Sequence, residues 1–158
     1  MADPSKNRLG LSQAYMAMPA KANYPDYTKH GCMVGRHLTP EMYERLYKKF
    51  TPNGVTVDKC IQVSCDSMGD IIGLVAGDEE SYDTFKELFD AIINEKHGGF
   101  GPNDKHPAPD LDANKLVGGV CDEKYVRSCR VRTGRSVKGL CLRPAISRAE
   151  RREVEKCI

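Results

Sequence analysis

The chain has 158 residues, of which 40% are hydrophobic and 29% charged, which is typical of a globular protein with one substantial core. It contains no apolar run near the ~20 residues that span a membrane and no apolar signal segment, so we expect no membrane partner and a cytoplasmic location. Its seven cysteines form no CxxC pair and its four histidines have no metal-type spacing, so we expect neither a zinc site nor a disulfide framework.

The N-terminal third of the sequence predicts an arm followed by two helices. Residues 1–22 are polar and rich in small side chains, and we predict a loosely ordered arm. The first firm helix is predicted over about 40–50, because Thr39 can cap it and Pro40 suits its first position. A short helix is predicted after Thr56.

A loop and the clearest helix of the chain come next. Residues 63–75 contain Gly and Ser without a sustained helical stripe, so a loop is predicted there. The following helix, over 79–97, has Asp78 as its expected cap and acidic residues in its first turn. Gly98 and Gly99 are expected to end it. Its wide apolar face comprises Tyr82, Phe85, Leu88, Phe89, Ile92 and Ile93.

A strand is predicted over 125–142, after a linker rich in Gly, Pro and Asp at 99–124. The side-chain period of a strand puts Ser128, Arg130 and Arg132 on one face. Two guanidinium groups beside a hydroxyl suit the oxygens of a phosphate. The alternative is a solvated basic edge strand, and the residue pattern alone leaves both interpretations open.

The net charge of +2 conceals a basic block at the C-terminal end. Residues 124–156 hold eleven Lys and Arg against three Glu, a balance of +8, so the remainder sums to −6. Such a block indicates a polyanionic partner. No aromatic side chain lies between Val126 and Ile158, so no platform for stacking single-stranded nucleic acid is present. We therefore predict a small phosphate ligand and no nucleic-acid partner.

The sequence Ser147-Arg-Ala-Glu150 is a capping box that predicts one more helix. The apolar stripe of this helix has only begun, with Val154, Cys157 and Ile158, when the sequence ends. A helix with an unfinished apolar face beside an unpaired strand is not a typical end of a domain. We therefore expect the chain to be a fragment of a longer protein.

Several segments resemble the phosphagen (guanidino) kinases. The sequence Arg-Val-Arg-Thr-Gly-Arg-Ser at 130–136 is similar to the nucleotide-binding strand of that family. Four other segments resemble the family in its order and spacing, namely 23–30, 38–43, 76–82 and 95–99. The similarity extends from about Asn23 to the last residue.

The resemblance implies a small all-α N-terminal domain followed by an α+β catalytic domain built on an antiparallel sheet. It divides the chain into the arm at 1–22, the helical domain at 23–98, the linker at 99–124 and an incomplete start of the ATP-binding domain at 125–158. The chain would then lack most of a kinase more than twice as long, which we expect to form a homodimer. No catalytic residue is assigned here, and the fragment alone is predicted to be inactive.

The implied reaction is reversible transfer of the γ-phosphoryl group of MgATP to a guanidino acceptor, with Mg²⁺ bound through the ATP phosphates. The resemblance assigns Ser128, Arg130 and Arg132 to the nucleotide phosphates. It also makes residues 63–75 the loop that closes over the acceptor, with four positions that match its substrate-touching part: Ile72, Gly73, Leu74 and Val75. The residues alone would favour a surface loop with a buried aliphatic plug.

The length of this loop and Lys96 bear on the acceptor. Thirteen residues separate Gln62 from Ala76, which resembles the short loop of the arginine and lombricine branches, whereas 76–81 and 135–141 resemble the creatine branch. Lysine before His-Gly-Gly is similar to the lombricine branch, and lombricine carries a phosphodiester. The alternative role of Lys96 is to complement the negative end of its helix.

We therefore predict lombricine as the acceptor. Arginine, glycocyamine or taurocyamine are the alternatives within the family. A non-catalytic nucleotide-binding or dimerisation module is the alternative outside enzyme function.

Overall fold

The structure is a computed structural model that describes residues 20–66, 69, 71–115, 117–119 and 121–157. Of the arm predicted at 1–22, only its last three residues lie within the described part. The described residues divide into two units: those up to Pro102 together with those from Ser136 onward, and those from Asn103 to Arg135.

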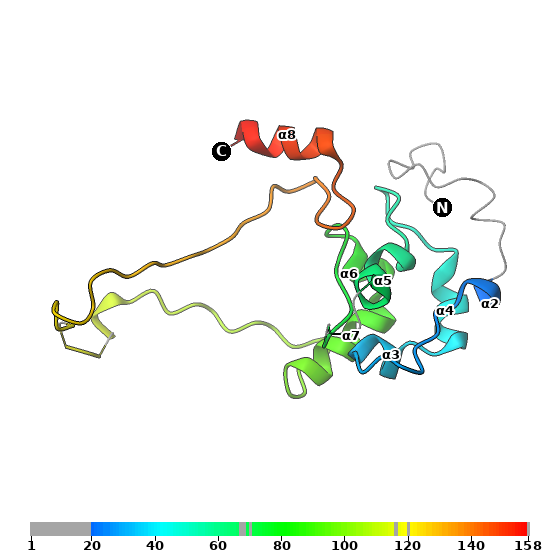
Figure 1. Cartoon of the computed structure of the whole chain (residues 1–158), viewed down its shortest axis with the longest axis horizontal. Helices are drawn as coiled ribbons and strands as arrows, with labels where there is room; N and C mark the ends of the chain where they lie inside the picture. The colour runs from blue at the N-terminus through cyan, green and yellow to red at the C-terminus, as the bar shows by residue number, and fades with distance from the viewer. Residues whose placement is uncertain (1–19, 67–68, 70, 116, 120, 158) are drawn as a thin grey trace. The chain divides into compact units, whose positions relative to one another are not determined.

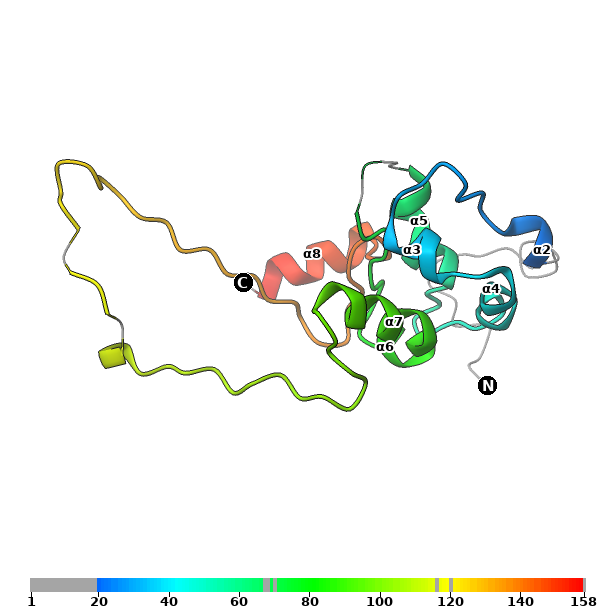
Figure 2. The same cartoon turned by 90° about the horizontal axis from the view of Figure 1, so that it is seen from below.

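The first unit is helical (Figures 1 and 2). Its helices are α2 (Ala20–Asn23), α3 (Met33–His37), α4 (Pro40–Tyr47), α5 (Val57–Asp66), α6 (Ser81–Thr84), α7 (Lys86–Lys96) and α8 (Arg148–Cys157). The second unit holds only the short 3₁₀ helix η2 (Ala113–Lys115) among its described residues. No strand forms in the described part of the chain, where one isolated antiparallel bridge joins Phe50 and Thr56. The expectation of a small all-α domain is confirmed.

Helix α4 follows its sequence signals closely. The Thr39 hydroxyl accepts a hydrogen bond from the Met42 amide at 3.2 Å, and Pro40 occupies the first turn. The predicted helix is confirmed, although it ends at Tyr47 and not at Phe50. The Lys49 amide donates to the Leu46 carbonyl at 2.9 Å, a tight turn that closes the helix early.

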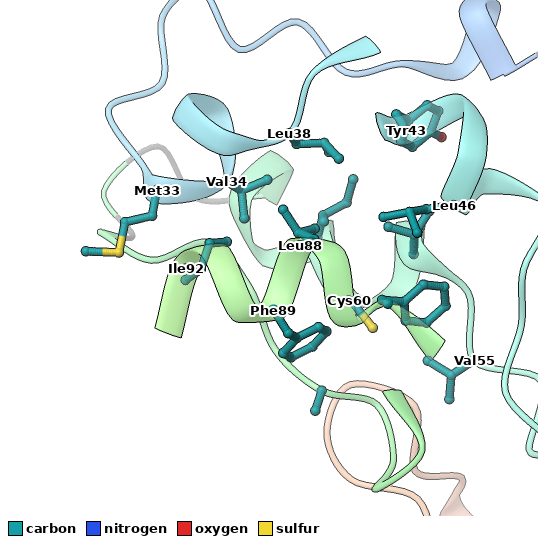
Figure 3. Packing of buried hydrophobic residues seen from close by; sticks show 14 of the residues in the cluster. Met33, Val34, Leu38, Tyr43, Leu46, Val55, Cys60, Leu88, Phe89 and Ile92 are labelled. Carbon is teal, nitrogen blue, oxygen red and sulfur yellow. The ribbon is translucent and has the colours of Figure 1, made fainter. Parts of the chain in front are cut away.

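The core lies between α3, α4, α5 and α7. Figure 3 shows Val34 of α3 lying over Leu88 and Ile92 of α7, and all three side chains are buried. Burial of each such aliphatic side chain contributes about 1.5–3 kcal/mol to folding. The short helix predicted after Thr56 is confirmed as α5, which adds Val57, Cys60 and Ile61 to this core.

The loop prediction at 63–75 is wrong at its start, because residues 63–66 complete helix α5. Ser64 is fully buried within that helix. Its hydroxyl donates to the Ile61 carbonyl at 2.6 Å, which satisfies the buried oxygen atom. A serine that bonds back to its own helix gives no sign of burial in the sequence.

The helix predicted over 79–97 is two helices, α6 and α7, which meet at Phe85. Phe85 leaves the helical region, with φ −111° and ψ 27°, and its side chain is fully buried. The predicted Asp78 cap is wrong, because the residue before α6 is Glu80. The buried Asp78 carboxylate instead accepts hydrogen bonds from the hydroxyls of Ser81, at 2.7 Å, and Thr51, at 2.5 Å.

The predicted end of α7 is confirmed. Gly98 and Gly99 have φ values of +68° and +102°, which favour glycine. The Gly99 amide donates to the Asn94 carbonyl at 2.8 Å, as in a Schellman motif. This turn fixes the position at which α7 ends, directly after Lys96.

The strand predicted over 125–142 does not form in this chain. A strand requires the N–H and C=O groups of a neighbouring strand, and no ladder is made by this segment in the described residues. Near the end of the segment, the Leu142 amide donates to the Gly77 carbonyl at 2.7 Å.

The capping box predicted at the start of α8 is confirmed. The Ser147 amide donates to Glu150 Oε2 at 2.9 Å, and the Glu150 amide donates to the Ser147 hydroxyl at 3.1 Å. The Cys141 amide donates to the other carboxylate oxygen at 3.2 Å. These bonds lower the pKa of Glu150 to about 2, against the opposing effect of desolvation.

Candidate functional site

The segment 71–75, which we call the acceptor loop, is held by the backbones of two helices. The first two amides of α3 donate to the carbonyls of Ile71 and Ile72, at 2.9 and 3.1 Å. The amide of Val75 donates to the carbonyl of Cys60 in α5, at 2.9 Å. Both ends of the acceptor loop are therefore attached to the helical core.

Gly73 lets the acceptor loop pass close to the core. Its φ of +79° lies in the left-handed region. A Cβ atom at this position would lie 2.7 Å from Cβ of Ser64 and 3.2 Å from Cβ of Cys32, two buried residues. Only glycine fits both the conformation and the space.

A pocket of about 280 Å³ lies between the acceptor loop and helices α6 and α7. The loop contributes Ile72, Leu74 and Val75, and the C-terminal end of α7 contributes Lys96. The remaining lining residues are Ala76, Tyr82, Phe89, Ile92, Ile93 and His97. The rings of Tyr82 and Phe89 pack against each other in this wall, with centroids 4.8 Å apart. The pocket thus has a largely apolar wall with basic side chains at one place.

Lys96 gives the edge of the pocket at the C-terminal end of α7 a positive charge. The side chain of Lys96 is exposed, and within the described residues it makes no hydrogen bond or ion pair. The lining contains no carboxylate. The neighbouring Glu95 is occupied by Arg36 and His37 of α3, each with a nitrogen 2.5 Å from one of its oxygens. Hydrogen bonds from these two residues lower the pKa of Glu95, so it stays ionised and paired. An anionic ligand group is therefore favoured beside Lys96.

The structure brings four of the five predicted acceptor residues into this one pocket: Ile72, Leu74, Val75 and Lys96. Gly73, the fifth, is buried within the acceptor loop, at the point where the loop passes closest to Ser64 and Cys32.

The predicted phosphate-binding residues lie in the second unit. Ser128, Arg130 and Arg132 are exposed on an extended segment and make no hydrogen bond or ion pair in the described part of the chain. Exposed guanidinium groups without protein partners are chemically suited to phosphate oxygens. The two sets of residues belong to separate units, each described by itself.

The sequence predicts Tyr82, Phe89 and Ile93 on the apolar face of a helix and gives His97 no role, yet all four line the pocket. Their spacing holds a signal. Phe89, Ile93 and His97 follow one another in steps of four residues along α7 and its C-cap, which puts them on one face, and Lys96 follows Ile93 by three. A stripe that ends in Lys and His differs from a core stripe.

In the described residues no three His, Cys, Asp or Glu side chains converge as metal ligands would. None of the described helices combines the length and the apolar character needed to cross a bilayer.

Comparison with known proteins identifies the family. Residues 28–94 match the ATP:guanido phosphotransferase N-terminal domain. Over 141 residues, covering 88% of the chain, the sequence is 72% identical to the lombricine kinase of Eisenia fetida. The chain contains the N-terminal domain of an ATP:guanido phosphotransferase.

The chain is also similar to a second curated kinase and to a solved structure. The glycocyamine kinase of Hediste diversicolor is 58% identical over 144 residues, again covering 88% of this chain. A crystal structure of lombricine kinase superimposes with a TM-score of 0.79 and 70% identity over 87% of the chain. The chain spans 38% of lombricine kinase and 36% of glycocyamine kinase. The similarity to the guanidino kinases inferred from the sequence is confirmed.

Proposed function

We propose that this chain supplies the acceptor pocket and the first phosphate-binding residues of a kinase that reversibly transfers the γ-phosphoryl group of MgATP to lombricine. The observation that carries the proposal is the pocket beside the acceptor loop, whose apolar wall has Lys96 at its edge. The 72% identity to a lombricine kinase supports the same acceptor.

The pocket suits a long acceptor with an anionic group. Apolar side chains from the acceptor loop and α7 exclude water, which strengthens an ion pair with the Lys96 ammonium group. The phosphodiester of lombricine is such an anion. Binding there would fix the acceptor at one end and leave its guanidino group to be directed toward the nucleotide.

Ser128, Arg130 and Arg132 would bind the phosphates of ATP or ADP. Two guanidinium groups and a hydroxyl can neutralise and orient phosphate oxygens, which is the main requirement of phosphoryl transfer. When bound together with the nucleotide, Mg²⁺ would supply further positive charge to the phosphate groups. On a sheet, the period of two would direct these three side chains to one face.

In the complete protein, the segment that follows the linker would be paired within a sheet. We infer that residues 125–142 become the first strand of an α+β catalytic domain, since an unpaired strand segment needs partners. The family resemblance also leads us to propose the domain limits given above, a homodimer and a cytoplasmic location. Sedimentation of the complete protein tests the dimer.

A second candidate acceptor is glycocyamine. It is favoured by the 58% identity to a glycocyamine kinase, and its carboxylate could also pair with Lys96. Glycocyamine is shorter than lombricine, so it would fill less of the pocket.

The substitution Lys96→Gln in the complete protein tests the role of the ammonium group. A charge-assisted contact contributes about 1.5–3 kcal/mol, so we expect KM for lombricine to rise about tenfold or more, with KM for ATP unchanged. Lys48→Gln is the matched control, because Lys48 lies at the C-terminal end of α4 as Lys96 does at that of α7. Equal effects of the two substitutions would mean that Lys96 only complements its helix.

A further inference from the structure

A cluster of three ionisable side chains lies next to the pocket and does not line it. It consists of Arg36 and His37 from α3 and Glu95 from α7. Arg36 uses both ends of its fork: Nη2 donates to Glu95 at 2.5 Å, and Nη1 donates to the Gly31 carbonyl at 2.8 Å. This arginine, in the last turn of α3, therefore joins the segment just before α3 to the end of α7.

Helix α3 also carries the acceptor loop. Its first two residues, Met33 and Val34, donate their amides to the carbonyls of Ile71 and Ile72. The link from the cluster to the pocket is thus short. It runs from Glu95 through α3 to the loop carbonyls, and from Glu95 directly along the chain to Lys96.

The two walls of the pocket are therefore fixed relative to each other by the same cluster. One wall is the acceptor loop, and the other is the C-terminal turn of α7 with Lys96.

We infer that Arg36 is a positioning residue of the acceptor site, which sets the spacing between Lys96 and the acceptor loop. The inference rests on the proposed function for the identity of the site. Arg36 itself does not line the pocket.

The chain offers a matched control in Arg45, which pairs with Glu87 at the other end of α7. The side chains of Arg36 and Glu95 are 49% and 35% exposed, and those of Arg45 and Glu87 are 54% and 42% exposed. Exposed ion pairs of this kind contribute little to stability. The Arg36→Gln and Arg45→Gln variants should therefore both fold, with similarly small losses in the free energy of unfolding. Only the first pair is linked to the acceptor loop.

Steady-state kinetics of the complete protein give the first test, using whichever guanidino acceptor it phosphorylates best. Arg36→Gln should raise the acceptor KM roughly 2- to 30-fold, the range seen when a contact that acts through a neighbouring element is lost, with KM for ATP unchanged. Arg45→Gln should leave both constants near those of the unsubstituted protein. Arg36→Lys keeps the charge but not the fork, so it should recover part of the loss.

Hydrogen exchange of residues 1–158 gives a second test that does not depend on activity. The Met33 and Val34 amides, which hold the acceptor loop, should exchange faster in Arg36→Gln than in Arg45→Gln. Equal exchange in the two variants, or an acceptor KM that responds to both alike, would overturn the inference. A complete protein with no preference for lombricine would contradict the proposed acceptor and leave the exchange result to decide the role of Arg36.

Discussion

The substitution Gly73→Ala should destabilise the helical unit and displace the acceptor loop. Placing an alanine at φ +79° costs about 1–2 kcal/mol. The new Cβ would lie 2.7 Å from Ser64 and 3.2 Å from Cys32, both buried, and such overpacking costs about 1–3 kcal/mol more. We therefore expect a loss of about 2–5 kcal/mol in the free energy of unfolding, measured by urea denaturation of residues 1–158.

Gly139→Ala separates the two contributions. Gly139 has nearly the same conformation, with φ +82°, but no heavy atom lies within 4 Å of the position of its Cβ. It should therefore lose only the conformational part, about 1–2 kcal/mol. In the complete protein, Gly73→Ala should also raise the acceptor KM, whereas Gly139→Ala should not. Equal losses of stability in the two variants would refute the close packing of the acceptor loop on α5.

Two further predictions concern the C-terminal segment. Glu150 has a lowered pKa, so its contribution to stability is complete above about pH 4.5 and is lost as the pH falls toward about 2. In denaturation measurements, Glu150→Gln should cost about 1 kcal/mol at pH 7 and clearly less at pH 2, where about half of the Glu150 carboxyls are protonated, whereas the exposed Glu153→Gln should show no such dependence. In the complete protein, Arg130→Ala should weaken ADP binding by about 1.5–3 kcal/mol in calorimetry. Arg127→Ala, on the opposite face of the proposed strand, should change it much less, and equal effects would contradict the assignment of faces.

The elements that the sequence predicts correctly are those with local signals. The Thr39 cap, the Ser147–Glu150 capping box and the Gly98–Gly99 end each depend on side chains within a few residues of the backbone groups they satisfy. Tertiary contacts determine the rest. The helix breaks at Phe85, whose backbone leaves the helical region while its ring is fully buried. No neighbouring residue in the sequence predicts this break.

The pocket, too, depends on tertiary contacts that the sequence does not reveal. The spacing between the acceptor loop and Lys96 in the sequence does not reveal that they meet, and only the family resemblance singled out both. Their proximity results from the packing of α3 on α7 and from the amides that α3 donates to the loop. The roles of Tyr82 and His97 in the lining were missed because an apolar stripe alone does not distinguish a pocket wall from a core face, and only the basic residues at its end mark the difference.

The most direct test of the proposed function is the acceptor specificity of the complete protein. The measurement is kcat/KM with MgATP for lombricine, glycocyamine, taurocyamine, arginine and creatine under one set of conditions. A phosphodiester beside Lys96 predicts the highest value for lombricine. A higher value for any of the other four acceptors would contradict the reading of the pocket, and no transfer to any guanidino compound would contradict the proposed function itself.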